Sequence, residues 1–429
     1  MSAATIETVH GRRVWDSRGR PTVEVEVTLA NGATGRAIAP AGASTGSGEA
    51  VDLRDGDPTF GGNDVTKAVS AVNVDIAEAL AGLDASRQDA VDQRLIDRDG
   101  TPGKARLGAN AIVATSMAAA HAAAAAAGQP LWRHLGGDKS ACLPLPEIQI
   151  LGGGAHAGRR VDVQDFMVIA VGAADYVQAL DWTAEVYRAA GDLLAAQGRL
   201  QGVADEGGFW PAFDRNEEGL ELLVRAIERA GLTPGQDVAI SLDVAASEFG
   251  SDGQYRLACE DRDFDSDGLA ALLIDWIDRY PIVAIEDPLG EDDRDGLIQF
   301  TQAVGDRVEI VGDDYLVTNA DRVRRAAAEG ACNAVLLKPN QAGTLTETKG
   351  AFQAARESGF GAIVSARSGE TEDVTIVHLG VGWGVPQLKV GSFARSERMA
   401  KWNEGLRIGE ALDGRLPPKS AFVWGRALS

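Results

Sequence analysis

The feature that most constrains the fold is a short apolar run that occurs five times and is followed each time by polar, mostly charged residues. Each run is four residues long, is rich in Val, Ile, Leu and Ala, and stands a helix-length segment or more from the next. Such runs are typical of buried parallel strands. They predict a β/α barrel, in which the residues after each strand gather at one end. The runs are 239–242, 282–285, 308–311, 334–337 and 361–364.

Three of the runs lead into carboxylates, Asp243, Glu286 and Asp313. A single acid after a strand is usually a helix N-cap or a solvated loop residue. Five polar strand ends together favour a functional site at the end of the barrel where these strands finish, which we call the mouth. An all-oxygen ligand set favours Mg²⁺ over zinc or copper. Lys338 follows the next run, and we expect burial and nearby positive charge to lower its pKa, so that it can act as a general base. A base beside Mg²⁺ suits abstraction of a proton α to a carboxylate.

Four further polar residues have roles in the same chemistry. Glu206, beside two glycines, can protonate a leaving hydroxide. Arg367 and Ser368 can hold a phosphoryl group, because arginine binds phosphate with a fork of donors. Lys389, at the last predicted strand end, can pair with a substrate carboxylate. His156 stands alone in a glycine-rich loop, where a structural role and a ligand-facing role are both open.

The overall charge excludes some partners. The 41 Lys and Arg against 63 Asp and Glu give a net charge of −22, which argues against nucleic acid and anionic membranes. Three cysteines suit reduced thiols, and residues 1–10 lack the pattern of a signal peptide, so we expect a cytoplasmic protein. The alanine-rich run 117–127 is short and contains a histidine, which favours a packed helix over a membrane span.

The N-terminal third has a different pattern. Residues 22–28 alternate as in a half-solvated antiparallel strand, and Asn31-Gly32 predicts a hairpin to a returning strand over 34–39. Three helical segments follow, at 64–83, 86–95 and 108–127. We therefore expect an α/β protein with an α+β cap domain over residues 1–138 and a β/α barrel catalytic domain over 139–429.

A stretch of small residues, 40–48, joins the predicted meander to the helices. It cannot pack a core by itself. Two interpretations are open: a flexible linker, or a mobile lid whose Ser44 reaches a ligand.

Ten motifs, in order along nearly the whole chain, resemble the enolase family of phosphopyruvate hydratases. They are Trp15-Asp-Ser-Arg-Gly-Arg-Pro-Thr-Val-Glu-Val, Gly42-Ala-Ser-Thr-Gly46, His156-Ala-Gly158, Asp205-Glu-Gly-Gly-Phe209, Asp243-Val-Ala-Ala-Ser-Glu-Phe249, Ile285-Glu-Asp-Pro288, Gly312-Asp-Asp314, Leu337-Lys-Pro-Asn-Gln341, Arg367-Ser-Gly-Glu-Thr-Glu-Asp373 and Ala394-Arg-Ser-Glu-Arg398.

The resemblance implies a dehydration of 2-phosphoglycerate with two Mg²⁺ ions per site, in a homodimer or an octamer built from dimers. It also implies a role for each matching residue. Asp243, Glu286 and Asp313 bind the first Mg²⁺ and Ser44 the second, while Lys338 is the base, Glu206 is the acid and Asp165 supports the acid. Arg367 and Ser368 hold the phosphate, Lys389 neutralises the substrate carboxylate, and His156 lies on a loop that closes over the phosphoryl end.

The chain departs from the family pattern at two important positions. Ala366 stands where enolases usually have histidine, and Asp165 stands where they usually have glutamate. Three smaller changes, at Gly152, Ala155 and Ala41, also shorten side chains. One explanation is drift in a redundant enolase.

Another explanation is a substrate with an added group near Ala366, such as the phosphonylated precursor of carboxyphosphonoenolpyruvate in phosphinothricin-type antibiotic pathways. A third hypothesis, a non-catalytic binding protein, is disfavoured because the predicted base, acid and metal carboxylates are all present.

Overall fold

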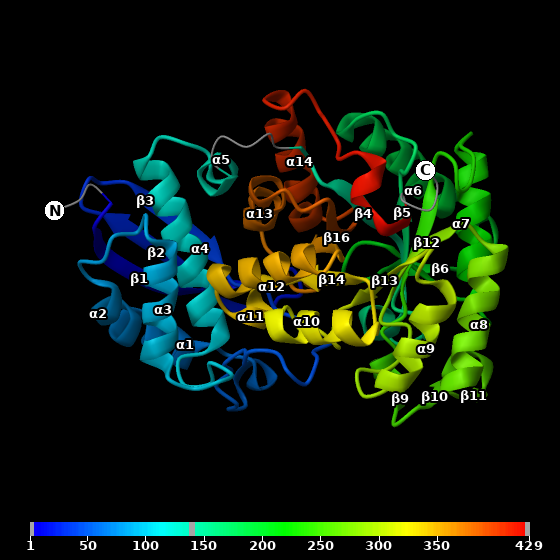
Figure 1. Cartoon of the computed structure of the whole chain (residues 1–429), viewed down its shortest axis with the longest axis horizontal. Coiled ribbons are helices and arrows are strands. Elements are labelled where there is room, and N and C mark those ends of the chain that lie inside the picture. Colours follow the sequence, from blue (N-terminus) through cyan, green and yellow to red (C-terminus); the bar gives the residue numbers. More distant parts are fainter. Residues whose placement is uncertain (1–3, 137–141, 425–429) are drawn as a thin grey trace.

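The computed structural model describes residues 4–136 and 142–424, which form a small N-terminal cap against a larger barrel (Figure 1). The domain boundary predicted between residues 138 and 139 lies outside the described residues. The cap has a three-stranded antiparallel sheet covered by helices. Its elements are β1 (Ile6–Trp15), β2 (Pro21–Leu29), β3 (Thr34–Ile38), α1 (Thr66–Ala71), α2 (Ala77–Leu80), α3 (Gln88–Asp99), α4 (Ala109–Ala126) and α5 (Leu131–Gly136).

The cap sheet follows the predicted meander, with β2 between β1 and β3. Gly32, at φ 82°, makes the turn that the sequence predicts. The expectation of a half-solvated β2 holds in part: Glu26 and Thr28 are partly exposed, but Glu24 is only 5% exposed. Arg12 and Arg36 on the neighbouring strands pair with the Glu24 carboxylate and cover it.

Helix α4 is the central helix of the cap and packs on β2 and β3. Its small side chains allow close contact, since a Cβ at Gly35 of β3 would overlap the α4 backbone at Ala118 and Ala122. By length and composition α4 could cross a membrane, but 83% of it is buried inside the protein. That burial is what a core helix shows, as predicted for the alanine-rich run.

The barrel is an eight-stranded closed sheet in the order β4–β5–β8–β12–β13–β14–β15–β16, closed by pairing of β16 with β4. The strand β5 is antiparallel to both of its neighbours, and the other neighbouring pairs are parallel. A hairpin, β6 with β7, extends the sheet beside β4. The strands are β4 (Leu145–Gly152), β5 (Asp165–Ile169), β6 (Leu200–Val203), β7 (Phe209–Pro211), β8 (Ala239–Asp243), β12 (Ile282–Glu286), β13 (Glu309–Gly312), β14 (Ala334–Leu337), β15 (Gly361–Ser365) and β16 (Gln387–Ser392).

Helices cover the outside of the barrel. Most of the longer ones begin at an Asp, Asn or Thr whose side chain accepts a hydrogen bond from the first turn, as at Asp175, Asp293 and Asn319. The helices are α6 (Tyr176–Ala196), α7 (Glu217–Arg229), α8 (Ser266–Arg279), α9 (Arg294–Val304), α10 (Ala320–Glu329), α11 (Pro339–Ala342), α12 (Leu345–Glu357), α13 (Thr375–Trp383) and α14 (Ser396–Glu410). A small separate sheet contains β9 (Gly250–Ser251), β10 (Gln254–Leu257) and β11 (Arg262–Asp265).

Buried polar contacts fix the cap to the barrel. Asp92 of α3 accepts hydrogen bonds from the backbone N–H and the hydroxyl of Thr346 in α12, at 2.8 and 2.6 Å. On the other side of the cap, the backbones of Ala41 and Gly369 exchange two hydrogen bonds of 2.9 Å. These contacts place residues 40–48 over the carboxyl end of the barrel.

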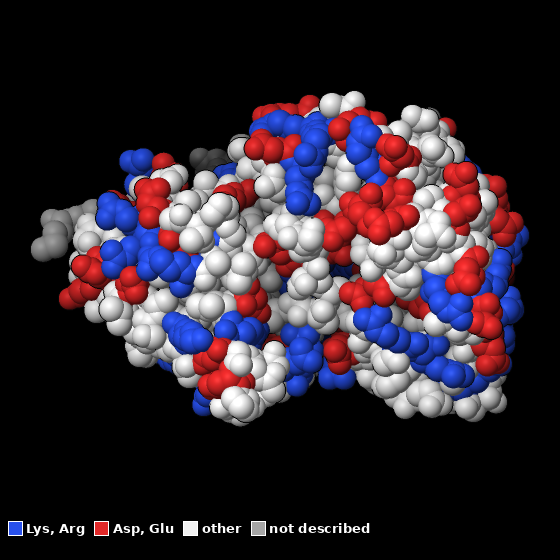
Figure 2. Space-filling view, turned by 90° about the horizontal axis from the view of Figure 1, so that it is seen from below, with Lys and Arg blue, Asp and Glu red and all other residues white. Residues whose placement is uncertain are grey.

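The charges are mixed on the surface despite the net charge of −22. On the face drawn in Figure 2, acidic and basic side chains interleave over the cap and the barrel instead of forming one continuous basic surface.

Candidate active site

The three predicted metal carboxylates converge at the carboxyl end of the barrel. Asp243 and Glu286 are the last residues of β8 and β12 and are direct neighbours in the parallel ladder, while Asp313 follows β13. Asp165 joins them because β5 runs antiparallel, so that its first residue pairs with Asp243. All four are at most 6% exposed. The position of a residue directly after an apolar run thus predicted Asp243, Glu286 and Asp313, whereas Asp165 does not follow such a run.

Lys389 lies among these carboxylates. Its Nζ is 2.8 Å from Asp243, 2.7 Å from Glu286 and 3.7 Å from Asp165. Burial alone would lower the pKa of Lys389, but the attraction of the carboxylates outweighs burial and raises the pKa well above its usual value. The residue is in the middle of β16 and not at its end, yet it reaches the mouth as predicted.

Lys338 follows β14 and forms a buried ion pair with Asp313. The predicted lowering of its pKa is wrong for this structure. Burial does lower the pKa of Lys338, but the charge of Asp313 more than compensates, so the pKa is raised. Gln341, from the next turn, donates a 2.8 Å hydrogen bond to the other oxygen of Asp313.

Glu206, His156 and Asp165 form a second buried cluster, with one potential ligand atom of each within 4.8 Å of the others. Gly207, at φ 97°, makes the turn that holds Glu206 inward. Burial raises the pKa of the Glu206 carboxyl, which favours the protonated form that an acid needs. The ring Nδ1 of His156 is 3.5 Å from Asp165, so the histidine is buried beside this carboxylate and is not solvated in its loop.

Two glutamines that were not predicted hold carboxylates of the mouth in place, Gln149 at Asp165 and Gln164 at Asp243. Gln149 donates to Asp165 and accepts from the backbone N–H of Gly208 at 2.8 Å. Gln164 donates to Asp243 at 3.0 Å. A neutral amide inside a strand carries no signal of its own, although Gln164 directly precedes Asp165 in the chain.

Arg367 follows β15 and is almost completely buried. Its guanidinium donates to the Ser44 carbonyl at 2.9 Å and forms a two-pronged ion pair with Glu49, at 2.9 and 3.1 Å. The structure therefore places Ser44 beside Arg367, on the barrel mouth. Glu49 was not predicted, because nothing in a short loop marks it as a partner of an arginine 318 residues away.

Ser368 and Ala366 flank Arg367 and are both buried. Arg398 of α14 fixes this turn, since it donates to the carbonyls of Arg367 and Ser368 at 2.7 and 2.6 Å. The Ala366 N–H donates to the Lys389 carbonyl at 2.9 Å, and its side chain packs with the apolar core of the barrel.

The carboxylates fit a hard cation such as Mg²⁺. Asp243, Glu286 and Asp313 offer only oxygen atoms, as Mg²⁺ prefers. One oxygen of Glu286, Oε1, is buried and has no hydrogen-bond partner among the described residues. A buried unpartnered acceptor is costly, and a cation held between these residues would satisfy it.

Comparisons with known proteins agree with this geometry. Residues 6–135 match the family described as "Enolase, N-terminal domain", and residues 140–417 match "Enolase, C-terminal TIM barrel domain". A curated relative named "Enolase 1", from Desulfitobacterium hafniense (strain Y51), is 49% identical over 428 residues, which cover 99% of this chain and 98% of the relative.

Proposed function

The chain belongs to the enolase family and is an enolase-type hydro-lyase, and we propose that its substrate is 2-phosphoglycerate, from which it removes water to give the enolpyruvate phosphate. The observation that carries the proposal is the arrangement of the mouth. Lys338 lies on one side of the three carboxylates, and Glu206 with Asp165 and His156 lies on the other. An elimination needs such a base and acid on separate sides of the reacting carbons.

Each side chain then has one task. Lys338 removes the proton α to the substrate carboxylate, Glu206 protonates the leaving hydroxide, and Lys389 pairs with the carboxylate as negative charge develops there. For Lys338 to be a base, its ion pair with Asp313 must weaken, since that pair keeps the ammonium charged.

Asp243, Glu286 and Asp313 would hold one Mg²⁺, and Ser44 would contribute to a second. When bound, Mg²⁺ would supply positive charge that lowers the cost of the extra negative charge on the carboxylate. Arg367 and Ser368 would bind the phosphoryl group, for which a buried guanidinium is a suitable partner.

A phosphonylated analogue with an added carboxyl group, as in antibiotic biosynthesis, is a second candidate. It rests on one observation, Ala366 in place of the usual histidine. The burial of Ala366 in the apolar core of the barrel favours 2-phosphoglycerate instead, because a carboxyl group there would be desolvated.

A steady-state assay with Mg²⁺ and 2-phosphoglycerate, following the absorbance of the enol product, tests the proposal. We expect turnover of roughly 1–10³ per second, the usual range for enzymes, and its loss in EDTA. Absence of turnover in protein that binds Mg²⁺ would overturn the assignment of 2-phosphoglycerate. The variant Ala366→His would then test the second candidate, because it should raise turnover of 2-phosphoglycerate if the natural substrate is the analogue, and no gain at all would count against that candidate.

We also propose a cellular location and an oligomeric state for the enzyme. The three cysteines are free thiols, which supports a reducing, cytoplasmic location. A homodimer, or an octamer built from dimers, is proposed from the family alone. Light scattering on the purified full chain would measure the mass and decide between these assemblies.

A further inference from the structure

Both terminal nitrogens of the Arg367 guanidinium are occupied by groups of the protein itself. Its Nη1 donates to Glu49 at 2.9 Å and to Asn340 at 3.1 Å. Its Nη2 donates to Ser44 at 2.9 Å and to Glu49 at 3.1 Å. Four acceptors therefore face the four N–H groups of the two terminal nitrogens. A phosphoryl group that binds this fork must displace at least one of these acceptor atoms. Glu49 supplies two of the four and is the only charged residue among the three that supply them.

The Glu49 carboxylate is held as a bound anion would be. One oxygen accepts from the backbone N–H of Gly46 at 3.1 Å and from the Gln341 amide at 3.3 Å, in addition to Arg367. A guanidinium, a backbone N–H and a side-chain amide are the donors that bind phosphate oxygens in proteins. The Glu49 carboxylate thus fills a site whose donors are suited to bind an anion.

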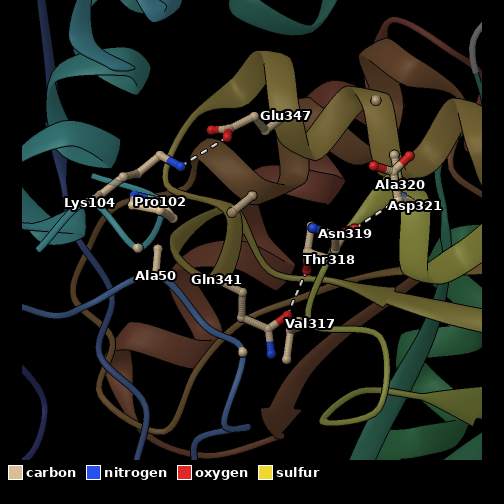
Figure 3. Close-up of a pocket in the computed structure, with 14 residues that line it drawn as sticks. Ala50, Pro102, Lys104, Val317, Thr318, Asn319, Ala320, Asp321, Gln341 and Glu347 are labelled. Carbon is tan, nitrogen blue, oxygen red and sulfur yellow. Dashed lines mark hydrogen bonds and ion pairs between the residues drawn. The ribbon is translucent and has the colours of Figure 1, made fainter. Parts of the chain in front are cut away.

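Gln341 connects this anion site to the catalytic carboxylates. Its amide nitrogen also donates to Asp313 at 2.8 Å. Its oxygen accepts from the Thr318 hydroxyl at 2.6 Å (Figure 3). Figure 3 also shows Ala50, the residue after Glu49, beside a cavity of about 250 Å³ between the cap and the barrel. Gln341 therefore links Glu49 directly to Asp313, the ion-pair partner of Lys338.

Glu49 has space to move away from Arg367. It lines a second cavity, of about 340 Å³, whose wall includes Arg18, Arg20 and Arg54. A carboxylate that left Arg367 would remain near positive charge there, so the cost of displacement is reduced.

We propose that Glu49 is a specificity-determining residue that occupies the phosphate site of Arg367 in the free enzyme and is displaced by the phosphoryl group of the substrate. The proposal rests on the proposed function, because it takes Arg367 as the phosphate anchor. A phosphoryl group carries a charge of about −1.5 to −2 and three strong acceptors, so it competes with a carboxylate on this fork. A hydroxy acid without a phosphoryl group cannot replace Glu49 and is excluded.

Titration of the Mg²⁺-loaded enzyme with inorganic phosphate in a calorimeter tests this directly. The variants Glu49→Gln and Glu49→Ala should bind phosphate about tenfold more tightly than the wild type, and the KM for 2-phosphoglycerate should fall in the same direction. The matched control is Glu291→Gln, which removes the same charge and weakens the bonds of 3.1–3.2 Å that Ser47 of the same loop donates to Glu291. In the part of the chain that the structure describes, Arg367 donates no hydrogen bond to Glu291, so its fork is left as it is. Its phosphate affinity should stay at the wild-type value.

Three results would overturn the proposal. Unchanged phosphate affinity in both Glu49 variants means that the carboxylate does not compete. Weaker binding means that Glu49 orients Arg367 instead of blocking it. An equal gain in Glu291→Gln assigns the effect to loop release or net charge. The variant Arg367→Gln separates this proposal from the proposed function: phosphate affinity that survives in it contradicts the phosphate anchor itself.

Discussion

Lys389 and Glu286 form a buried ion pair in the middle of the three carboxylates, with 2.7 Å between Nζ and Oε2. Lys389 is also 2.8 Å from Asp243, so a single ammonium pairs with two of the carboxylates that fit Mg²⁺. The mouth of the free protein is thus stabilised by the side chain to which we assign the pairing with the substrate carboxylate.

Removal of that ammonium should destabilise the metal-free protein. In Lys389→Met two buried carboxylates lose their partner, which costs about 3–5 kcal/mol for a buried pair. Mg²⁺ should return a larger part of the stability to this variant than to the wild type. Urea unfolding in EDTA and in Mg²⁺ measures both effects. Lys349→Met, a change at an exposed lysine of α12, is the control and should leave both values unchanged. An equal loss of stability in Lys389→Met and Lys349→Met would contradict the role given to the buried ammonium.

The acid side of the pH–stability curve should depend on Asp165. Burial alone would raise the pKa of its carboxyl, but His156, Lys389 and Gln149 outweigh burial and lower the pKa from 3.8 to about 2. Between these values the unfolded chain binds more protons than the folded protein. The stabilising contribution is therefore complete above about pH 4 and is lost as the pH falls toward 2.

Unfolding of the metal-free protein by urea across this range checks the sign. The decline in the free energy of unfolding between pH 4 and pH 2 should be shallower in Asp165→Asn, which lacks the titrating carboxyl. A variant with the wild-type slope would show that Asp165 does not titrate in this window.

Two glycines in barrel helices should respond in opposite directions to the same substitution. A Cβ at Gly219 of α7 would overlap the ring of Phe166, which is fully buried, whereas a Cβ at Gly350 of α12 meets no atom within 4 Å. Gly219→Ala should lose about 1–3 kcal/mol by overpacking. Gly350→Ala should gain up to about 1 kcal/mol from helix propensity. Thermal unfolding measures both, and a gain at Gly219 would contradict the packing described here.

The sequence predicted the site well where a residue follows a strand. Asp243, Glu286, Asp313 and Lys338 were found because the direction of a parallel strand fixes which end its polar residue occupies. The antiparallel β5 was not predicted, since a buried run has the same composition in either direction. The pKa of Lys338 was predicted with the wrong sign because it depends on the contact with Asp313, which only the fold reveals.

Contacts between segments far apart in the chain were not predicted. Glu49 meets Arg367, and Arg398 holds the turn around it, through side chains that no local pattern brings together. The roles predicted for Lys338 and Glu206 came from their positions beside predicted strand ends and agree with the family resemblance, and the structure adds their separate positions around the carboxylates.

The central claim is that Lys338 is the base and Glu206 the acid, and hydrogen exchange at the α carbon of 2-phosphoglycerate tests it most directly. The exchange is followed by NMR in D₂O with Mg²⁺. We expect the wild type to exchange the α proton and form product, Glu206→Gln to exchange it with product formation reduced about 10²–10⁴-fold, the usual contribution of a general acid, and Lys338→Met to do neither. Exchange that persists in Lys338→Met, or that disappears in Glu206→Gln while Lys338 is intact, would contradict the assignment.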